Sequence, residues 1–392
     1  MNSTRRNVGL LAGCQAMLFT NNSTLVAING LAGLALAPRP SLATLPVTCW
    51  VLGGALATMP ASLYMKRVGR QAGLTAGTFW AVAGALVCGA AIYGGYFSLL
   101  CLGALLFGVY NAHGQYYRFA AADAVPPEQR PTAISLVLAG GLIGGILGPA
   151  LSRWTLELGA RKFMGAYLTL IGVAIVTMAL LRFIRIPVPS AAERAAAGRP
   201  LAEIAAQPKF IVAVLAAAIG YGVMNFLMTS TPIAMQICGY AFSATAFVIS
   251  SHIVAMFAPS FVTGALIRRF GTIPVMLSGA ALNLVTIAIA LAGITIAHFW
   301  WALVLLGIGW NFLYTGGTTL LTETYRPEER AKAQGANDQA IFIMMLVSSF
   351  TSGATVTTAG WERVNLFALP LVAIVAVALV WFLLQQRRVA AA

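Results

Sequence analysis

Long apolar runs recur along the whole chain, and short segments carrying glycine, proline or charged residues separate them. A run of about 20 apolar residues is long enough for one helix to cross the hydrocarbon core of a bilayer. Glycine, proline and charge mark where such helices end. The pattern predicts twelve transmembrane helices, at 8–32, 43–65, 72–93, 97–119, 132–154, 162–185, 208–231, 243–267, 273–294, 297–321, 335–357 and 365–385. The predicted fold class is therefore an all-α integral membrane protein.

Polar motifs in the predicted loops occur twice at nearly one spacing. Residues 62–69, after the second predicted helix, match 264–271, after the eighth. Residues 127–130, after the fourth helix, match 327–330, after the tenth. Two single pairs keep the same spacing, Asn111 with Asn311 and Asp123 with Glu323. Such coincidences indicate two parallel repeats of six helices each.

The longest hydrophilic stretch lies between the sixth and seventh predicted helices. It divides the chain into an N-terminal six-helix bundle (1–185), a cytoplasmic linker (186–207) and a C-terminal six-helix bundle (208–392). We expect the two bundles to form a monomer.

The charged residues lie mostly in the short loops. Only 9% of the residues are charged, against about 25% in a typical soluble domain. If both termini are cytoplasmic, most of the 24 basic residues face the cytoplasm, as the positive-inside rule requires. The apolar runs and the placement of the basic residues thus predict a multi-pass protein of the bacterial cytoplasmic (inner) membrane with both termini in the cytoplasm, and the net charge of +14 belongs to these loops. A nucleic-acid partner is not expected, because no basic stripe interleaves with aromatic residues.

The sequence shows no pattern typical of an enzyme. We see no nucleophile beside a base, no acid–base pair and no cofactor motif, so neither catalysis nor a bound cofactor is expected. The five cysteines lie in or beside apolar runs without a CxxC pair, which argues against a disulfide framework.

Two short motifs carry the strongest chemical signal. Met224-x-x-x-Met228 and His252-x-x-x-Met256 each put two side chains one helical turn apart on one helix face. They fall at comparable depth in the seventh and eighth predicted helices. Thioether and imidazole are ligands that suit monovalent copper. The alternative is packing, since methionine fills irregular gaps in apolar cores, but a histidine inside a membrane span usually faces a cavity or a polar partner.

The twelve helices in two parallel repeats resemble the organisation of major facilitator superfamily (MFS) transporters. Residues 62–70 also resemble that family's signature G-x-x-x-D-R-x-G-R, because Arg67, Gly69 and Arg70 match while Ser62 and Lys66 depart from it. The resemblance implies transport by alternating access and a role for this loop in holding the cytoplasmic side closed.

The reversed charge at Lys66 predicts a pairing with Asp338, at the start of the eleventh helix. The predicted cytoplasmic gate consists of Lys66, Arg67, Gly69, Arg70, Asp338, Arg268 and Arg269. The alternative is that these are solvated loop charges that only set the orientation.

The Met and His pairs resemble those of the CcoA-like copper importers, an MFS branch that supplies copper for cytochrome oxidase assembly. The resemblance implies that Met224, Met228, His252 and Met256 bind copper, as Cu(I), and that copper chaperones of oxidase assembly are possible partners. The bilayer is the remaining partner. Possible accessory residues are Met235, Cys49, His113, Asn111, Asn311 and Tyr221.

Two other substrates remain open. Relatives of the copper branch carry riboflavin, and aromatic residues such as Tyr221 and Tyr314 could stack on its ring system, so uptake of riboflavin or another small organic molecule is the main alternative. A glycine-rich run in the fifth helix, 140–149, resembles a signature of drug/proton antiporters. Close helix packing explains that run equally well.

Overall fold

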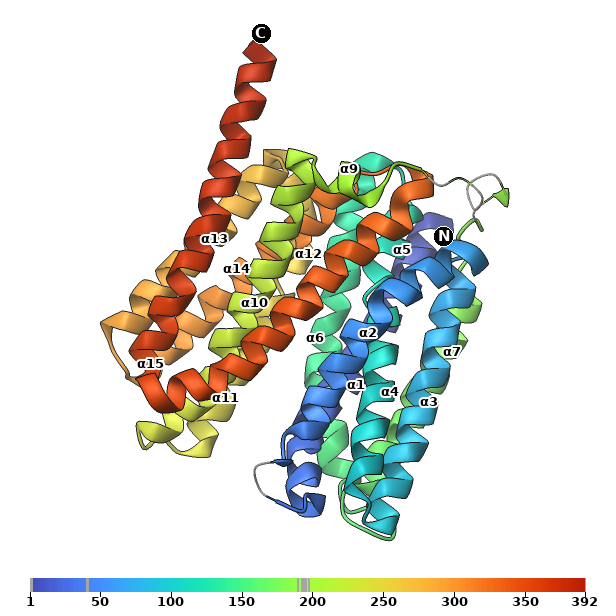
Figure 1. The fold of residues 1–392 in the computed structure, drawn as a ribbon, viewed down its shortest axis with the longest axis vertical. Coiled ribbons are helices and arrows are strands. Elements are labelled where there is room, and N and C mark those ends of the chain that lie inside the picture. Colours follow the sequence, from blue (N-terminus) through green and yellow to red (C-terminus); the bar gives the residue numbers. More distant parts are fainter. Residues whose placement is uncertain (1–2, 40–41, 189, 192–195, 197, 392) are drawn as a thin grey trace. The chain divides into compact units, whose positions relative to one another are not determined.

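The computed structural model describes residues 3–39, 42–188, 190–191, 196 and 198–391, and it is helical almost throughout (Figure 1). The main helices are α1 (Ser3–Leu36), α2 (Leu45–Val68), α3 (Arg70–Gly94), α4 (Phe97–Gly114), α5 (Tyr117–Asp123), α6 (Arg130–Thr155), α7 (Met164–Arg182), α9 (Leu201–Ala205), α10 (Pro208–Ile237), α11 (Phe242–Phe257), α12 (Ser260–Phe270), α13 (Thr272–Ala292), α14 (Ile296–Leu321) and α15 (Arg330–Ala391). Each of the twelve predicted spans overlaps one or two of these helices, and the predicted all-α fold class is confirmed.

Within the described residues, nine helices are long and apolar enough to cross a membrane. The number becomes ten if α11 and α12, which meet at a 41° bend, form one span. The N-terminal helix α1 is not among them; Asn21, Asn22 and Ser23 make its centre polar. The number of spans also differs from the predicted twelve because α15 is counted as one helix although it covers two predicted spans.

A single break divides the 62 residues of α15. Gly360 has φ 80° and ψ 172°, a conformation that only glycine adopts readily. The predicted spans 335–357 and 365–385 lie on either side of it. The residues on both sides of Gly360 are helical, so the two predicted spans meet there without a connecting loop.

The sequence repeat recurs in the backbone. Gly69 (φ 89°, ψ 164°) ends α2, and Gly271 (φ 89°, ψ 160°) ends α12 in the same conformation. Two 3-10 turns, Pro127–Gln129 and Pro327–Glu329, also correspond, each leading directly into a long helix. The matching motifs thus build matching turns.

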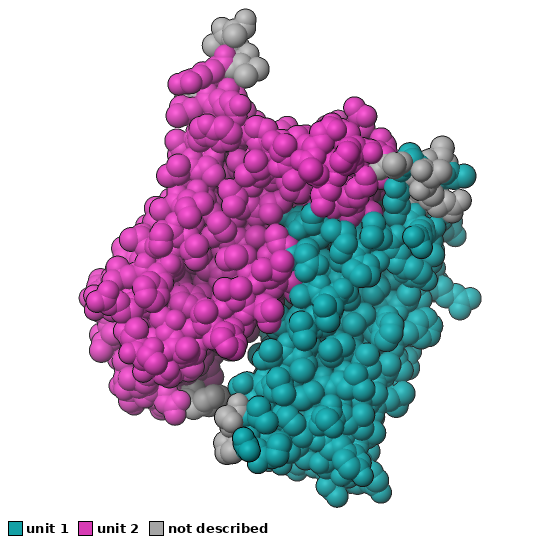
Figure 2. All heavy atoms as spheres, in the orientation of Figure 1, with its two compact units in different colours: residues 1–127, 136–197, 334–339 teal, residues 128–135, 198–333, 340–392 magenta. Residues whose placement is uncertain are grey.

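The chain forms two compact units, coloured separately in Figure 2. Unit 1 comprises Met1–Pro127, Leu136–Ala197 and Gln334–Gln339, and unit 2 comprises Glu128–Ser135, Gly198–Ala333 and Ala340–Ala392. Relative to the predicted halves, each unit thus contains one short segment from the other half of the sequence. Residues 189, 192–195 and 197 of the predicted linker lie outside the described residues.

Glycines bring the helices of unit 1 into backbone contact. A Cβ atom on Gly53 of α2 would overlap the carbonyl of Leu105 on α4, and one on Gly108 would overlap the carbonyl of Trp50. In the same way, the predicted glycine run of α6 packs on α1, where the Ser23 hydroxyl donates to the Gly144 carbonyl at 2.8 Å. Packing therefore accounts for that run.

Candidate functional site

His252 of α11 lies fully buried against α14. Its Nδ1 donates to the backbone carbonyl of Leu303 at 2.7 Å, so Nδ1 carries the proton and Nε2 has a free lone pair. Nε2 is buried and has no hydrogen-bond partner among the described residues. A backbone carbonyl that fixes the tautomer in this way is the usual support of a metal-ligating histidine, although no metal is needed to hold the ring.

The methionines of α10 can be located along α14. A Cβ on Gly317 would contact Ala217, and one on Gly220 would contact Leu313, so α10 and α14 run antiparallel. Met224 lies one turn beyond Gly220. Met224 is therefore beside the part of α14 that lies about one turn before Leu313, and its side chain is buried.

The second pair of predicted ligands lies at a similar depth. His252 bonds to Leu303, while a Cβ on Gly307 would contact the Met256 backbone, so α11 runs parallel to α14. Met228, half-buried, follows Met224 by one more turn. All four predicted ligands thus lie within about two to three turns of α14. Their convergence on one point stays a prediction.

An aromatic cluster adjoins these residues on α14. Trp310 stacks on Tyr314, with ring centroids 4.9 Å apart and planes inclined by 14°. Tyr221 of α10 contacts both rings edge-on at 5.5 Å, and Phe257 of α11 contacts Trp310 at 5.7 Å. The Trp310 Nε1–H is buried without a partner among the described residues. Tyr221, the half-buried member, gives the cluster its accessible side.

Polar groups lie one turn further along α10. The Asn225 amide donates to the hydroxyls of Ser348 and Ser349, both at 2.8 Å, on α15. The hydroxyl of Ser230 lies 2.9 Å from that of Ser352. Aromatic faces and amide or hydroxyl groups therefore occur side by side on α10, a combination suited to a flat, polar-edged organic molecule.

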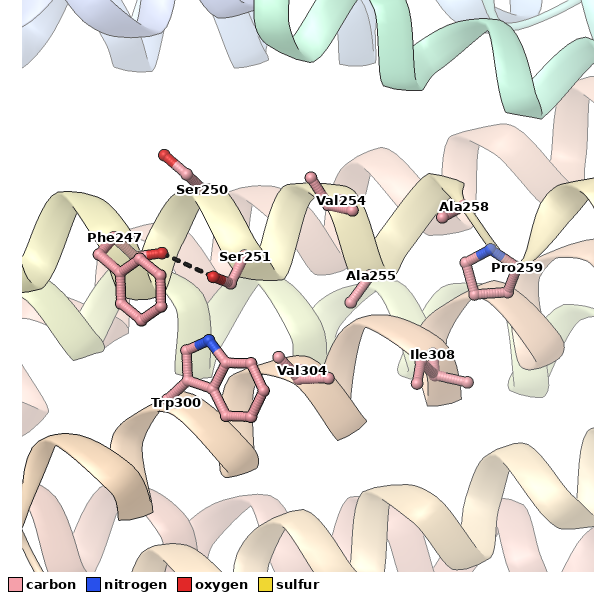
Figure 3. A pocket seen from close by; sticks show the side chains of 10 residues that line it. All are labelled: Phe247, Ser250, Ser251, Val254, Ala255, Ala258, Pro259, Trp300, Val304 and Ile308. Carbon is pink, nitrogen blue, oxygen red and sulfur yellow. Dashed lines mark hydrogen bonds between the residues drawn. The ribbon is translucent and has the colours of Figure 1, made fainter.

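A groove of about 570 Å³ runs along α11 and α14 in unit 2 (Figure 3). Its lining is apolar apart from two serines, and the Ser251 hydroxyl bonds to the carbonyl of Phe247 at 2.9 Å. Neither His252 nor Met256 lines it. The groove lacks the convergent polar groups that orient a polar ligand, so we do not assign it to the predicted site.

The accessory residues mostly bridge helices. Asn111 accepts from Asn22 of α1 at 2.8 Å. Asn311 donates to the Met256 carbonyl at 2.7 Å and to the Ser260 hydroxyl at 2.6 Å, and so supports the bend between α11 and α12.

The remaining accessory residues are enclosed by their neighbours. His113 bonds to the Val109 carbonyl of its own helix and packs against Gly77. Met235 is fully buried. Cys49 is a half-buried free cysteine in α2. An accessory role for these three residues stays a prediction.

The predicted pairing of Lys66 with Asp338 is wrong. The Lys66 ammonium donates to the Ala196 carbonyl at 2.9 Å, and Asp338 instead forms a buried ion pair with Arg118 of α5. Arg118 can take this role because it lies in the same buried layer, only 1% exposed, whereas Lys66 lies at the end of α2.

The other gate residues divide into two groups. Arg70 is buried, pairs with Asp123 at 3.0 Å and donates to Gln334. Gly69 supplies the turn described above. The side chains of Arg67, Arg268 and Arg269 are exposed. The gate itself stays a prediction.

Arg118 is the buried residue that the sequence reasoning missed. A charged side chain inside an apolar span was the available signal, since such residues in membranes are rare and usually functional. Arg118 stands at the end of the predicted span 97–119, where a basic residue is expected in a solvated loop.

Long apolar helices in two repeats, with buried polar groups at their crossings, are typical of secondary membrane transporters. The chain belongs to the Major Facilitator Superfamily: that family's model matches residues 11–343 and, in a second match, 214–392. The second match begins in the C-terminal half, as expected for a repeated unit.

Relatives agree with this assignment. The riboflavin transporter RfnT of Brucella anthropi is 39% identical over 383 residues, 96% of each chain. The fold is similar to that of the MFS transporter FucP, with a TM-score of 0.79, 15% identity and coverage of 97% of this chain and 99% of that one. It is also similar to the human organic anion transporter MFSD10, with a TM-score of 0.78, 10% identity and coverage of 97% and 100%.

Proposed function

We propose that this protein is a secondary transporter that imports riboflavin across the bacterial cytoplasmic membrane, with both termini in the cytoplasm. The observation that carries the proposal is the 39% identity to a riboflavin transporter over 96% of both chains. The Met and His motifs favoured copper, with riboflavin as the alternative, and this identity favours riboflavin over copper.

The aromatic cluster supports the proposal chemically. Riboflavin carries a flat ring system with polar edges, and aromatic side chains stack on such rings with about 0.5–1.5 kcal/mol per pair beyond the area buried. Tyr221 supplies an accessible ring beside Trp310, and Asn225 lies one turn away on the same helix. Amide and hydroxyl groups can satisfy the polar edge of the ring system.

Copper import, as Cu(I), is the second candidate. The buried and unpartnered Nε2 of His252 favours it, because an unsatisfied acceptor in an apolar interior costs about 1–3 kcal/mol unless it binds something. Met224, Met228 and Met256 would complete a neutral ligand set that favours a monovalent ion. Under this reading, the protein would supply copper for oxidase assembly.

Labelled riboflavin uptake separates the two candidates. The host is a bacterium that neither makes nor imports riboflavin, and it expresses the native chain, Tyr221→Leu, His252→Ala or the exposed control Phe367→Leu at matched membrane levels. We expect native uptake, with KM raised up to about tenfold in Tyr221→Leu, as about 1.4 kcal/mol predicts. Phe367→Leu should match the native chain.

Copper uptake is measured in the same strains. Copper accumulation that requires His252, with no riboflavin uptake, would overturn the proposal and establish the second candidate. Riboflavin uptake that is insensitive to His252→Ala would leave the histidine a packing residue.

A further inference from the structure

Two free cysteines stand at matching positions of neighbouring helices in unit 1. Cys49 lies one helical turn after Leu45, the first residue of α2, and Cys101 lies one turn after Phe97, the first residue of α4. Both side chains are half-buried. Each thiol is therefore within reach of a reagent from the side of the membrane on which its helix begins.

The register of α2 and α4 brings these two positions together. A Cβ on Gly53 would overlap the carbonyl of Leu105, and further along, the Tyr116 hydroxyl donates to the Thr58 carbonyl at 2.8 Å. Both contacts advance in the same direction along the two helices, so α2 and α4 run parallel. The two cysteines lie one turn before the first of these contacts, on the same faces of their helices as the residues that make it.

The helices approach closely enough for a bond between the two sulfur atoms. The backbones of α2 and α4 touch at Gly53, where a side chain has no room. One turn away, the thiols of Cys49 and Cys101 interact electrostatically. A disulfide requires Cα atoms about 4.4–6.8 Å apart, a spacing within reach of parallel helices whose backbones touch one turn away.

A third cysteine lies nearby but is closed to the same chemistry. Cys88 of α3 is fully buried, and its thiol donates to the Leu100 carbonyl of α4 at 3.9 Å. It also interacts electrostatically with Cys101. Because a reagent must reach a thiol before it can oxidise it, the reactive pair is Cys49 with Cys101.

We propose that Cys49 and Cys101 form a disulfide at the periplasmic ends of α2 and α4. With both termini cytoplasmic, both helices begin on the periplasmic side, where disulfides form and persist. The inference therefore rests on the orientation given in the proposed function. One bond between two helices also differs from the multi-disulfide framework that the cysteine spacing argues against.

The oxidant is the disulfide of a periplasmic thiol–disulfide oxidoreductase. One cysteine thiolate attacks that disulfide, forms a mixed disulfide and releases the first thiol of the oxidant. The second cysteine thiolate attacks the mixed disulfide, forms the bond between α2 and α4 and releases the second thiol. Two electrons and the two thiol protons thus pass to the oxidant, which leaves as a dithiol.

The test counts reducible thiols in the full chain, expressed in a bacterium with a periplasmic disulfide oxidoreductase. Cells are quenched with acid, free thiols are blocked in SDS, and the protein is then reduced and labelled with a polyethylene-glycol maleimide. We expect two labels on the native chain and none on Cys49→Ser or Cys101→Ser. Cys238→Ser is the matched control, because Cys238 is a half-buried cysteine of unit 2, and it should keep both labels.

A reductant that does not cross the cytoplasmic membrane locates the bond. Added to intact cells before the acid quench, it should remove both labels. Labels that disappear only when the cells are broken first would place the pair in the cytoplasm, and they would overturn the inference together with the orientation.

Riboflavin uptake by the same cells keeps the inference apart from the proposed substrate. Uptake by a native chain without reducible thiols overturns the disulfide and leaves the proposed function intact. Two labels without uptake leave the disulfide and overturn the substrate. Mass spectrometry of the linked peptides identifies the partners, and a bond that includes Cys88 overturns the inference.

Thermal unfolding in detergent measures what the bond does. A cross-link between positions far apart in the sequence restricts the unfolded chain, so reduction should lower the melting temperature of the native chain and leave that of Cys101→Ser unchanged. Equal melting temperatures of the native chain with and without reductant would overturn a stabilising role for the bond.

Discussion

Gly69 and Gly271 share one backbone conformation, with φ 89° at both and ψ within a few degrees (164° and 160°). Each ends a helix by donating its N–H to the fourth residue before it, Met65 or Ile267, and each begins the next helix. This conformation is almost restricted to glycine, so the turn depends on the residue type and not on the surrounding charges.

Replacing either glycine by alanine should destabilise the protein. A Cβ in this region of φ and ψ costs about 1–3 kcal/mol, and we expect a lower melting temperature in detergent for Gly69→Ala and Gly271→Ala. Gly172→Ala is the matched control, since it lies within helix α7 with open space around it. Equal melting temperatures for all three variants would refute the argument.

These turns were within reach of the sequence, because glycine and proline determine local backbone geometry. The repeated motifs predicted both turns, and apolar run length predicted where the long helices lie, nine or ten of which among the described residues are apolar enough to cross a membrane. Arg118 and Asp338 are 220 positions apart, and nothing local links them. The sequence showed two charges but not their pairing, because the pairing depends on how α5 and the start of α15 pack.

Two buried asparagines on adjacent helices should respond differently to substitution. Asn311 makes three hydrogen bonds, to Met256, Ser260 and Thr263, whereas neither polar atom of Asn283 has a partner among the described side chains and backbone. Asn311→Ala leaves its buried hydrogen-bond partners unsatisfied and should lower the free energy of unfolding by about 1–3 kcal/mol. Asn283→Ala should lower the free energy of unfolding by clearly less.

Thermal unfolding of the two asparagine variants, followed by size-exclusion chromatography after heating, measures the difference. The native chain is the reference for both. If Asn283→Ala proved the more damaging change, the bend between α11 and α12 would not depend on the Asn311 amide.

A two-pronged ion pair anchors the chain before α10. Arg199 donates from Nε and Nη2 to the two oxygens of Glu329, both at 2.7 Å, and Glu329 is fully buried. These hydrogen bonds raise the pKa of the Arg199 guanidinium, so it stays charged at any physiological pH. Arg326 also donates its backbone N–H to Glu329.

Glu329→Ala should therefore lower the melting temperature, since it leaves several donors without their acceptor. Glu323→Ala is the control: its bond to Lys209 at 2.9 Å is exposed, and exposed ion pairs contribute at most about 1 kcal/mol. Limited proteolysis of the chain on the C-terminal side of residue 199 should be faster than in the native protein for Glu329→Ala and unchanged for Glu323→Ala. Comparable melting temperatures and cleavage rates in the two variants would contradict the prediction.

The contact between α2 and α4 leaves no room for a side chain at Gly108. A Cβ there would overlap the Trp50 carbonyl, so Gly108→Ala must push two backbones apart and should reduce the yield of folded protein. Gly353→Ala, where the same atom meets open space, should express normally. Fluorescence-detected chromatography of tagged variants gives the yields, and a normal Gly108→Ala peak would show that the helices can separate at no cost.

The buried ion pair also bears on the ancestry of the chain. By the spacing that matches Asn111 with Asn311, the counterparts of Arg118 and Asp338 are Thr318 and Leu138, which cannot form an ion pair. A gene duplication would have produced two identical halves, and the glycine turns still reflect that origin. The charges exist in one copy only, so the two halves have diverged at these positions since they were duplicated.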